Sequence, residues 1–259
     1  MPEGDTVYRS ARALDAVLAG RVLDVSDFRV PAFATVDLRG ETVHGVVSVG
    51  KHILHRIGDV TVHSHLKMEG SWHVYPAGAK WRRPARDARA ILGVPGWVTV
   101  GFSLGVLEIV PRGRENDVVG YLGPDILGAD WDLETATRNL VADPDRSVGL
   151  ALLDQRVIAG LGNVYRNEIC FLRGLLPTRP MREVPDVAGL VSLAHRVILA
   201  NRDRAQRSTT GDLRPGRTSW VSQRAGKPCL RCGTRIRRGS LGEDALTQRD
   251  TYFCVACQT

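Results

Sequence analysis

The sequence predicts an α+β protein in which helices and strands occupy separate stretches of the chain. Three observations predict it: short β-branched runs broken by Gly and Pro between residues 21 and 110, helical periodicity further along, and paired cysteines near the C-terminus. We therefore expect an N-terminal helix and a β-sandwich in residues 1–115, a helical domain in 116–220, and a C-terminal zinc-ribbon hairpin in 221–259.

The composition is that of an ordinary soluble globular protein. Of the 259 residues, 43% are apolar and 24% are charged, which allows buried cores and excludes disorder as the dominant state. Residues 92–107, which lie within the longest uncharged run of the chain, are interrupted by Gly, Pro and Ser and indicate a hairpin instead of a membrane span. The first residues are acidic and lack the apolar run of an export signal, so we expect a cytoplasmic protein.

Helices are expected where apolar residues recur at helical spacing. The first covers residues 5–18, with Asp5 as its cap and Gly20 ending it. The same periodicity predicts four later helices, over 133–141, 147–157, 163–172 and 186–202.

Positive charge is concentrated near the C-terminal end. The chain carries a formal net charge of +7, whereas residues 201–238 hold eleven Lys or Arg and two Asp, a local charge of +9. The Gly-, Ser- and Thr-rich part of this segment, 203–219, is expected to be a mobile loop. A basic segment on a near-neutral body is typical of proteins that bind a polyanion, and a solvated charged surface is the alternative.

Four of the five cysteines form two Cys-x2-Cys pairs separated by 21 residues. In a chain without an export signal this favours metal binding over disulfides. Four thiolates complete a tetrahedral Zn²⁺ site and leave no open position, so we expect one structural zinc ion. Its ligands are Cys229, Cys232, Cys254 and Cys257. Cys170 lies on an apolar helix face and is expected to be buried.

Two other motifs approach functional patterns without meeting their requirements. Residues 45–52 nearly match a phosphate-binding loop, but His52 replaces the hydroxyl that holds Mg²⁺ and the preceding residues form a strand pattern. His63 and His65 share one strand face, yet no third ligand stands at a telling spacing. Ordinary hydrogen-bonded histidines are therefore the favoured interpretation.

The N-terminus offers a candidate nucleophile. Removal of the initiator Met, expected before a residue as small as proline, leaves a secondary amine at Pro2. An α-amino group titrates at about 8 and lysine at about 10.4, so far more of the terminal amine is free base at neutral pH. Attack of this amine on a sugar aldehyde carbon gives an iminium cation, an electron sink for elimination. Glu3 beside it can shuttle protons. Alone, this start is equally that of many ordinary chains.

Residues 152–168 resemble the helix–two-turns–helix motif of the formamidopyrimidine-DNA glycosylase and endonuclease VIII family. Gly160 and Gly162 allow close backbone approach, and Asn163 stands where the second helix begins, so that free amides there can bind phosphate.

The resemblance spans the whole chain. The Met-Pro-Glu-Gly start, Gly50-Lys51 on a strand, and the cysteine hairpin closing with Cys257-Gln258 are similar to the same family. The opening Met-Pro-Glu-Gly-Asp-Thr and the segment 209–214 most resemble the endonuclease VIII branch of actinobacteria.

The resemblance implies a bifunctional DNA glycosylase and AP lyase of base excision repair. Its substrate would be damaged double-stranded DNA, with single strands as a further candidate, and oxidised pyrimidines as the favoured lesions. Strand nicking would proceed by β,δ-elimination through a Schiff base on the terminal proline. A monomer in the cytoplasm, associated with the nucleoid, is implied as well.

The resemblance also implies roles for four catalytic residues. Pro2 would attack C1′ of the flipped-out nucleotide, and Glu3 would protonate the sugar ring. Lys51 would donate a proton in β-elimination and contact phosphate. Arg249 would grip phosphate and promote δ-elimination.

For DNA binding, the resemblance implies that Asn163 and Arg249 hold backbone phosphates. Met68, flanked by Lys67 and Glu69, would be the wedge that fills the gap left by the flipped base.

Two alternatives stay open beside this interpretation. A non-catalytic zinc-ribbon protein could use the same scaffold to hold a DNA or RNA backbone, but it would not need Pro2, Glu3, Lys51 and Arg249 together. A metalloenzyme built on the two histidines of residues 63–65 would need an open metal position that the sequence does not supply.

Overall fold

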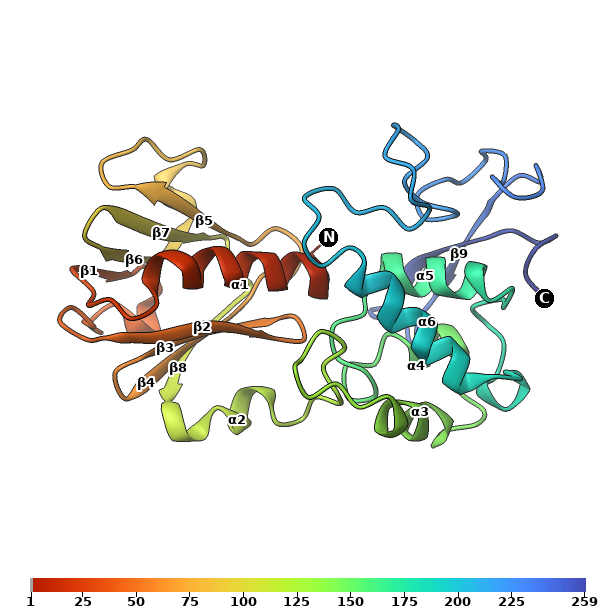
Figure 1. Ribbon diagram of the computed structural model, residues 1–259, viewed down its shortest axis with the longest axis horizontal. Helices are drawn as coiled ribbons and strands as arrows, with labels where there is room; N and C mark the ends of the chain where they lie inside the picture. The colour runs from red at the N-terminus through yellow and green to blue at the C-terminus, as the bar shows by residue number, and fades with distance from the viewer. Residues whose placement is uncertain (1) are drawn as a thin grey trace. The chain divides into compact units, whose positions relative to one another are not determined.

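The computed structural model describes residues 2–259, which divide into two compact units, 2–121 and 122–259 (Figure 1). The first unit holds one long helix and two four-stranded sheets, and the second holds most of the helices and a two-stranded hairpin. The α+β class is therefore confirmed. Within residues 2–259, no helix combines the length and the apolar character needed to cross a bilayer.

The first unit is a β-sandwich whose sheets have the strand orders β1-β6-β7-β5 and β2-β3-β4-β8, with antiparallel neighbours throughout. The strands are β1 (Val25–Phe28), β2 (Val43–Val49), β3 (His52–Ile57), β4 (Val60–His65), β5 (Ser71–Pro76), β6 (Ala88–Val94), β7 (Trp97–Phe102) and β8 (Val106–Pro111). Short helical segments lie at Pro31–Phe33, Ala85–Asp87 and Arg112–Arg114, and α2 covers Asn116–Val119. One apolar core takes side chains from both sheets, as a sandwich requires.

Helix α1 (Gly4–Leu18) packs against strands of both sheets and contributes to this core with the apolar residues that predicted it (Figure 1). The prediction that Asp5 caps the helix is wrong. Glu3 is the N-cap residue, and Asp5 lies inside the first turn, where its carboxylate accepts the Thr6 amide at 2.7 Å. Gly20 ends the helix with φ +73, a conformation that favours glycine.

In the second unit the helices surround a separate apolar core. They are α3 (Leu133–Val141), α4 (Val148–Ala151), α5 (Asn163–Leu172) and α6 (Val187–Leu199), with a short segment at Met181–Glu183. The predictions for α3 and α5 are confirmed. Cys170 of α5 is fully buried in this core, as expected, and burial raises the pKa of its thiol to about 12.

The predicted helix 147–157 is wrong after Ala151, where two turns begin. The Gln155 side chain stabilises these turns: its amide nitrogen donates to the carbonyls of Leu153 (2.7 Å) and Leu161 (3.0 Å), and its oxygen accepts the Gly160 amide at 3.0 Å. Gly160 has φ +105, outside the helical region. Side-chain bonds to the backbone therefore replace the helical ladder here.

Residues 203–219 contain no regular helix or strand. The segment that follows is tied to the helical core by Glu168 of α5, a fully buried carboxylate. It accepts the consecutive backbone amides of Trp220 (2.7 Å), Val221 (3.0 Å) and Ser222 (2.8 Å). The chain then ends in the antiparallel hairpin β9 (Arg237–Leu241) and β10 (Arg249–Phe253).

The first unit is expected to lose stability as the pH falls. His55 is fully buried with its ring 4.6 Å from that of Trp72, and burial lowers its pKa to about 4. In the unfolded chain, His55 has a pKa of about 6.5 and binds a proton that it does not bind in the folded state. The free energy of unfolding therefore falls as the pH drops from about 6.5 towards 4. At pH 5 the His55 contribution to that loss is about 2 kcal/mol. Urea unfolding at pH 7 and pH 5 measures it.

In His55→Phe the difference between the two pH values should shrink by this amount. The exposed residue His44 is the control, because His44→Gln should leave the difference as it is in the unmodified protein. An equal loss of unfolding free energy between pH 7 and pH 5 in all three proteins would contradict the lowered pKa of His55.

Candidate active site and nucleic-acid interface

The N-terminal residues are held by the start of α1. Pro2 is half-buried and precedes Glu3, whose side chain is 0% exposed. The Glu3 carbonyl accepts the amides of Thr6 (2.9 Å) and Val7 (3.0 Å), so the first helical turn fixes the backbone beside Pro2. A buried carboxyl next to a terminal proline can exchange a proton with groups brought to that nitrogen. The expected removal of Met1 concerns a residue outside the described part of the chain.

Lys51 lies in the two-residue turn between β2 and β3, so the prediction that it is on a strand is wrong. Gly50, with φ +58, takes the first position of this turn, where two-residue hairpins favour glycine. The preceding residues 45–49 lie in β2, which confirms that the phosphate-loop pattern is a strand. The turn places the Lys51 amine at the end of the sheet.

A chain of hydrogen bonds runs beside this turn. Nδ1 of His63 lies 2.8 Å from Oε2 of Glu108, a carboxylate oxygen that can only accept, and Nε2 of His63 lies 2.7 Å from Nδ1 of His52. Nε2 of His52 in turn lies 3.1 Å from the Tyr121 hydroxyl. The strand register places His52 opposite His65 and Glu108 opposite His63. These pairings could not be predicted from the sequence, because register is not visible in local patterns.

These histidines do not form a metal site: among residues 2–259, only the four cysteines of the terminal hairpin are close enough together to hold an ion. Burial, together with the nearby charges of Lys51 and Lys67, lowers the pKa of His52 to about 3 and that of His65 to about 4. Both imidazoles are therefore neutral at pH 7. Lys51 and Lys67 therefore supply positive charge beside these histidines, and this charge favours the binding of an anion.

The turn between β4 and β5, residues 66–70, is here called the wedge turn. Met68 at its tip is 65% exposed, so it is not a core residue. Lys67 has φ +52, and its amide donates to Nδ1 of His65 at 2.9 Å. Glu69 is exposed on the other side of Met68. A long apolar side chain thus projects from a turn of the first unit.

In the second unit, the first turns of α5 dock on strand β10. Asn163 begins α5, and its amide nitrogen donates to the Asp250 carbonyl at 2.9 Å, while its oxygen accepts from the Arg166 guanidinium. Arg166 reaches the same carbonyl at 2.9 Å, and the Tyr252 amide donates to Oδ1 of Asn167 at 3.2 Å. Of these residues only Asn163 was predicted from the sequence, although the polar residues at i, i+3 and i+4 share one helix face.

Arg249 is the first residue of β10 and is exposed. Its guanidinium donates to the Gln248 carbonyl at 2.8 Å. The docking of α5 on β10 therefore brings Asn163 close to the strand that carries Arg249, within one unit.

The four hairpin cysteines fit a tetrahedral metal site. Their sulfur atoms all lie within 4.8 Å of one another, with Cys229 and Cys257 4.0 Å apart and Cys232 and Cys254 3.5 Å apart. Zinc–sulfur bonds of about 2.3 Å in a tetrahedron separate the sulfurs by about 3.8 Å. Gln258 secures the end of the hairpin, because it accepts the Cys254 amide (2.8 Å) and donates to the Leu175 carbonyl (2.7 Å).

Comparison with known proteins gives a consistent result for both units. The family model of the formamidopyrimidine-DNA glycosylase N-terminal domain matches residues 1–98, and that of the formamidopyrimidine-DNA glycosylase H2TH domain matches residues 122–201. The chain is 53% identical to the "Probable endonuclease 8 2" of Streptomyces coelicolor, with 100% of this chain and 94% of the relative covered. It is 50% identical to the "DNA-(apurinic or apyrimidinic site) lyase Nei2" of Mycolicibacterium smegmatis, over 100% and 99% of the two chains.

Solved structures share the fold at lower identity. The Lactococcus lactis Fpg, solved in complex with an abasic site containing DNA, has a TM-score of 0.82 and 21% identity, with 100% of both chains covered. MutM in complex with carbocyclic 8-oxo-G containing DNA gives the same values. With full-length relatives at about half identity, and with both units matched, this chain belongs to the formamidopyrimidine-DNA glycosylase and endonuclease VIII family.

Proposed function

We propose that this protein is a bifunctional DNA glycosylase and AP lyase of base excision repair that acts on damaged double-stranded DNA. The observation that carries the proposal is the arrangement at the N-terminus, where Pro2 directly precedes the fully buried carboxyl of Glu3 at the start of α1, so that removal of Met1 would place an amine beside this carboxyl. The similarity to an AP lyase over the full chain supports it. A protein that only binds nucleic acid needs neither group.

The proposed reaction begins with the Pro2 nitrogen. It bonds to C1′ of the damaged nucleotide, the glycosidic bond breaks, and the base leaves with a proton. Glu3 protonates the sugar ring oxygen, so the ring opens and the iminium cation forms. Loss of a C2′ proton then breaks the C3′–O bond, and a second elimination breaks the C5′–O bond. Water finally hydrolyses the iminium and frees the proline.

Three basic side chains support these steps in the proposal. Lys51 donates a proton during the first elimination and holds phosphate. Arg249 binds phosphate and promotes the second elimination, and Lys67 adds positive charge within the wedge turn. Asn163 contributes a further contact to the phosphate backbone of the DNA. Such a contact positions the protein on the duplex but does not distinguish one base sequence from another.

Oxidised pyrimidines are the proposed lesions, and single strands are proposed as a further substrate. The proposal is supported by the similarity to proteins named endonuclease 8. We further propose that the protein is a monomer in the cytoplasm, associated with the nucleoid. We also propose that one zinc ion is bound by Cys229, Cys232, Cys254 and Cys257. Such an ion stabilises the fold and takes no part in catalysis, because the four cysteines fill all its coordination positions.

Cleavage of four matched duplexes tests the function and its specificity. They carry thymine glycol, dihydrouracil, 8-oxoguanine or an abasic site in one sequence context. We expect nicking at the abasic site, and faster excision of the two pyrimidines than of the purine. Nicking of none of them would leave a binding protein as the better interpretation, and faster excision of 8-oxoguanine would contradict the pyrimidine preference.

Removing the Met68 side chain should slow excision from duplexes more than from loosely held substrates. Flipping a paired base costs a few kcal/mol, and a wedge offsets part of that cost. Met68→Ala is therefore expected to slow excision of a paired lesion by roughly tenfold and to leave nicking of an abasic site nearly unchanged. Single-turnover rates on both duplexes measure the difference. Equal slowing on both would contradict the wedge role.

A further inference from the structure

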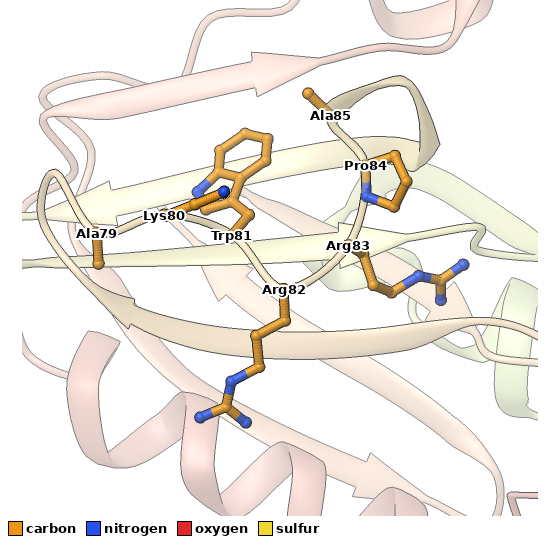
Figure 2. A pocket seen from close by; sticks show the side chains of 7 residues that line it. All are labelled: Ala79, Lys80, Trp81, Arg82, Arg83, Pro84 and Ala85. Carbon is orange, nitrogen blue, oxygen red and sulfur yellow. The ribbon is translucent and has the colours of Figure 1, made fainter.

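A basic loop lies between strands β5 and β6 of the first unit. Residues 79–85 of this loop line a shallow hollow of about 560 Å³ (Figure 2). Figure 2 shows that neighbouring Arg82 and Arg83 point in different directions from the loop. Arg82 is exposed, whereas the Arg83 side chain is 27% exposed and turns towards the sandwich.

The Arg83 guanidinium joins three separate turns. One nitrogen, Nη1, donates to the backbone carbonyl of Glu69 (3.0 Å) and to the hydroxyl of Ser71 (3.1 Å), at the wedge turn and the start of β5. The other, Nη2, donates to the Ser103 hydroxyl at 2.9 Å, between β7 and β8, and lies 3.7 Å from the Asp87 carboxylate. The planar fork of arginine suits this arrangement, because its donors point along fixed directions.

The backbone that Arg83 holds is strained. Lys67 and Ser103 are two of three non-glycine residues with positive φ in residues 2–259, at +52 and +47. Gly105 packs under Lys67 so closely that a Cβ added there would lie 2.2 Å from Cγ of Lys67, and its amide donates to the His65 carbonyl at 3.1 Å. Such conformations persist when surrounding contacts over-determine them.

We propose that Arg83 is a positioning residue for base extrusion, which holds the wedge turn so that Met68 enters the duplex without prior rearrangement. Met68 is too exposed to be held by its own packing, so its position depends on the turn. Ordering a free turn during DNA binding would cost conformational entropy, and a turn already ordered avoids that cost. The proposal rests on the wedge role of Met68 in the proposed function.

A direct phosphate contact by Arg83 is the competing role. Both terminal nitrogens of Arg83 already donate to acceptors of the protein itself. Arg82 is an exposed residue of the same loop whose side chain points in a different direction from that of Arg83, and it provides a matched control of equal charge.

The first measurement concerns the turn itself. Amide hydrogen exchange of residues 66–70 in the free protein should be faster in Arg83→Gln and unchanged in Arg82→Gln. Arg83→Lys keeps the charge but loses the fork, so its exchange should also be faster. Unchanged exchange in Arg83→Gln would overturn the proposal, whatever the catalytic activity.

The second measurement is single-turnover excision. On a paired lesion, Arg83→Gln should be slower by up to roughly tenfold, the effect expected for loss of the wedge itself. On an abasic site in the same duplex it should stay close to the unmodified protein, and Arg82→Gln should be unchanged on both. In a Met68→Ala background, Arg83→Gln should add little, since both changes act on one step.

Three results would overturn the positioning role. Equal slowing on both substrates would indicate a general defect. Full additivity with Met68→Ala would show that Arg83 and Met68 act independently. A lower salt dependence of DNA affinity in Arg83→Gln than in Arg83→Lys would assign Arg83 to phosphate instead. If the unmodified protein cleaved none of the duplexes, the proposed function would fail, and hydrogen exchange would still report whether Arg83 holds the turn.

Discussion

Protein that retains Met1 or carries an N-terminal tag is expected to form no covalent adduct with abasic DNA and to lose both excision and nicking. The nitrogen of Pro2 is then an amide, whose lone pair is delocalised and does not attack carbon. After removal of Met1, borohydride added during reaction with abasic DNA should reduce the iminium to a stable crosslink. Mass spectrometry should locate that crosslink on the N-terminal peptide.

Two variants separate the nucleophile from its neighbour. Pro2→Gly supplies a primary amine in the same place and should keep part of the activity. Glu3→Gln removes the proton source and should slow base excision by about 10²- to 10⁴-fold, the range for a general acid, with a smaller effect on abasic sites. A crosslink on Lys51 in the unmodified protein would contradict the assignment of Pro2.

Loss of one metal ligand should unfold the terminal hairpin and sharply weaken DNA binding. The apolar cluster at the hairpin is small, and two of its five buried members are the cysteines Cys229 and Cys254. In isolated zinc fingers the metal contributes about 10–16 kcal/mol, far more than such a cluster. Cys232→Ser should therefore lose the metal and disorder β10, which carries Arg249 and holds Asn163, while the sandwich stays folded.

Metal analysis, duplex affinity and hydrogen exchange of β10 measure these effects. Cys170→Ala is the control, because this thiol is buried in the helical core outside the metal cluster and its removal should leave the metal in place. Unmodified affinity after chelation and confirmed metal loss would contradict the structural role of the ion.

Local patterns in the sequence determined much of this protein. The period of apolar residues predicted α1, α3 and α5, because an amphipathic helix needs only neighbours within its own turns. The short β-branched runs predicted a sandwich, and the spacing of the cysteines predicted a cluster that the structure brings together. Chemistry made Pro2 and Glu3 candidates, and the resemblance of the whole chain to a known family was needed to single them out.

Contacts between distant segments were decided by the tertiary structure. Lys51 lies in a turn, and the register of β3, β4 and β8 joins His52 to His63 and Glu108. The sequence pattern also extended one helix beyond Ala151, where Gln155 closes two turns instead.

The attachment of Asn163 to β10 and of Arg83 to the wedge turn was equally invisible in the sequence. Asn163 lies 87 residues from its partner Asp250, and Arg83 lies 14 residues from Glu69. Local periodicity carries no information on which distant carbonyl a side chain will meet, because that depends on how strands register and how elements pack once the cores have formed.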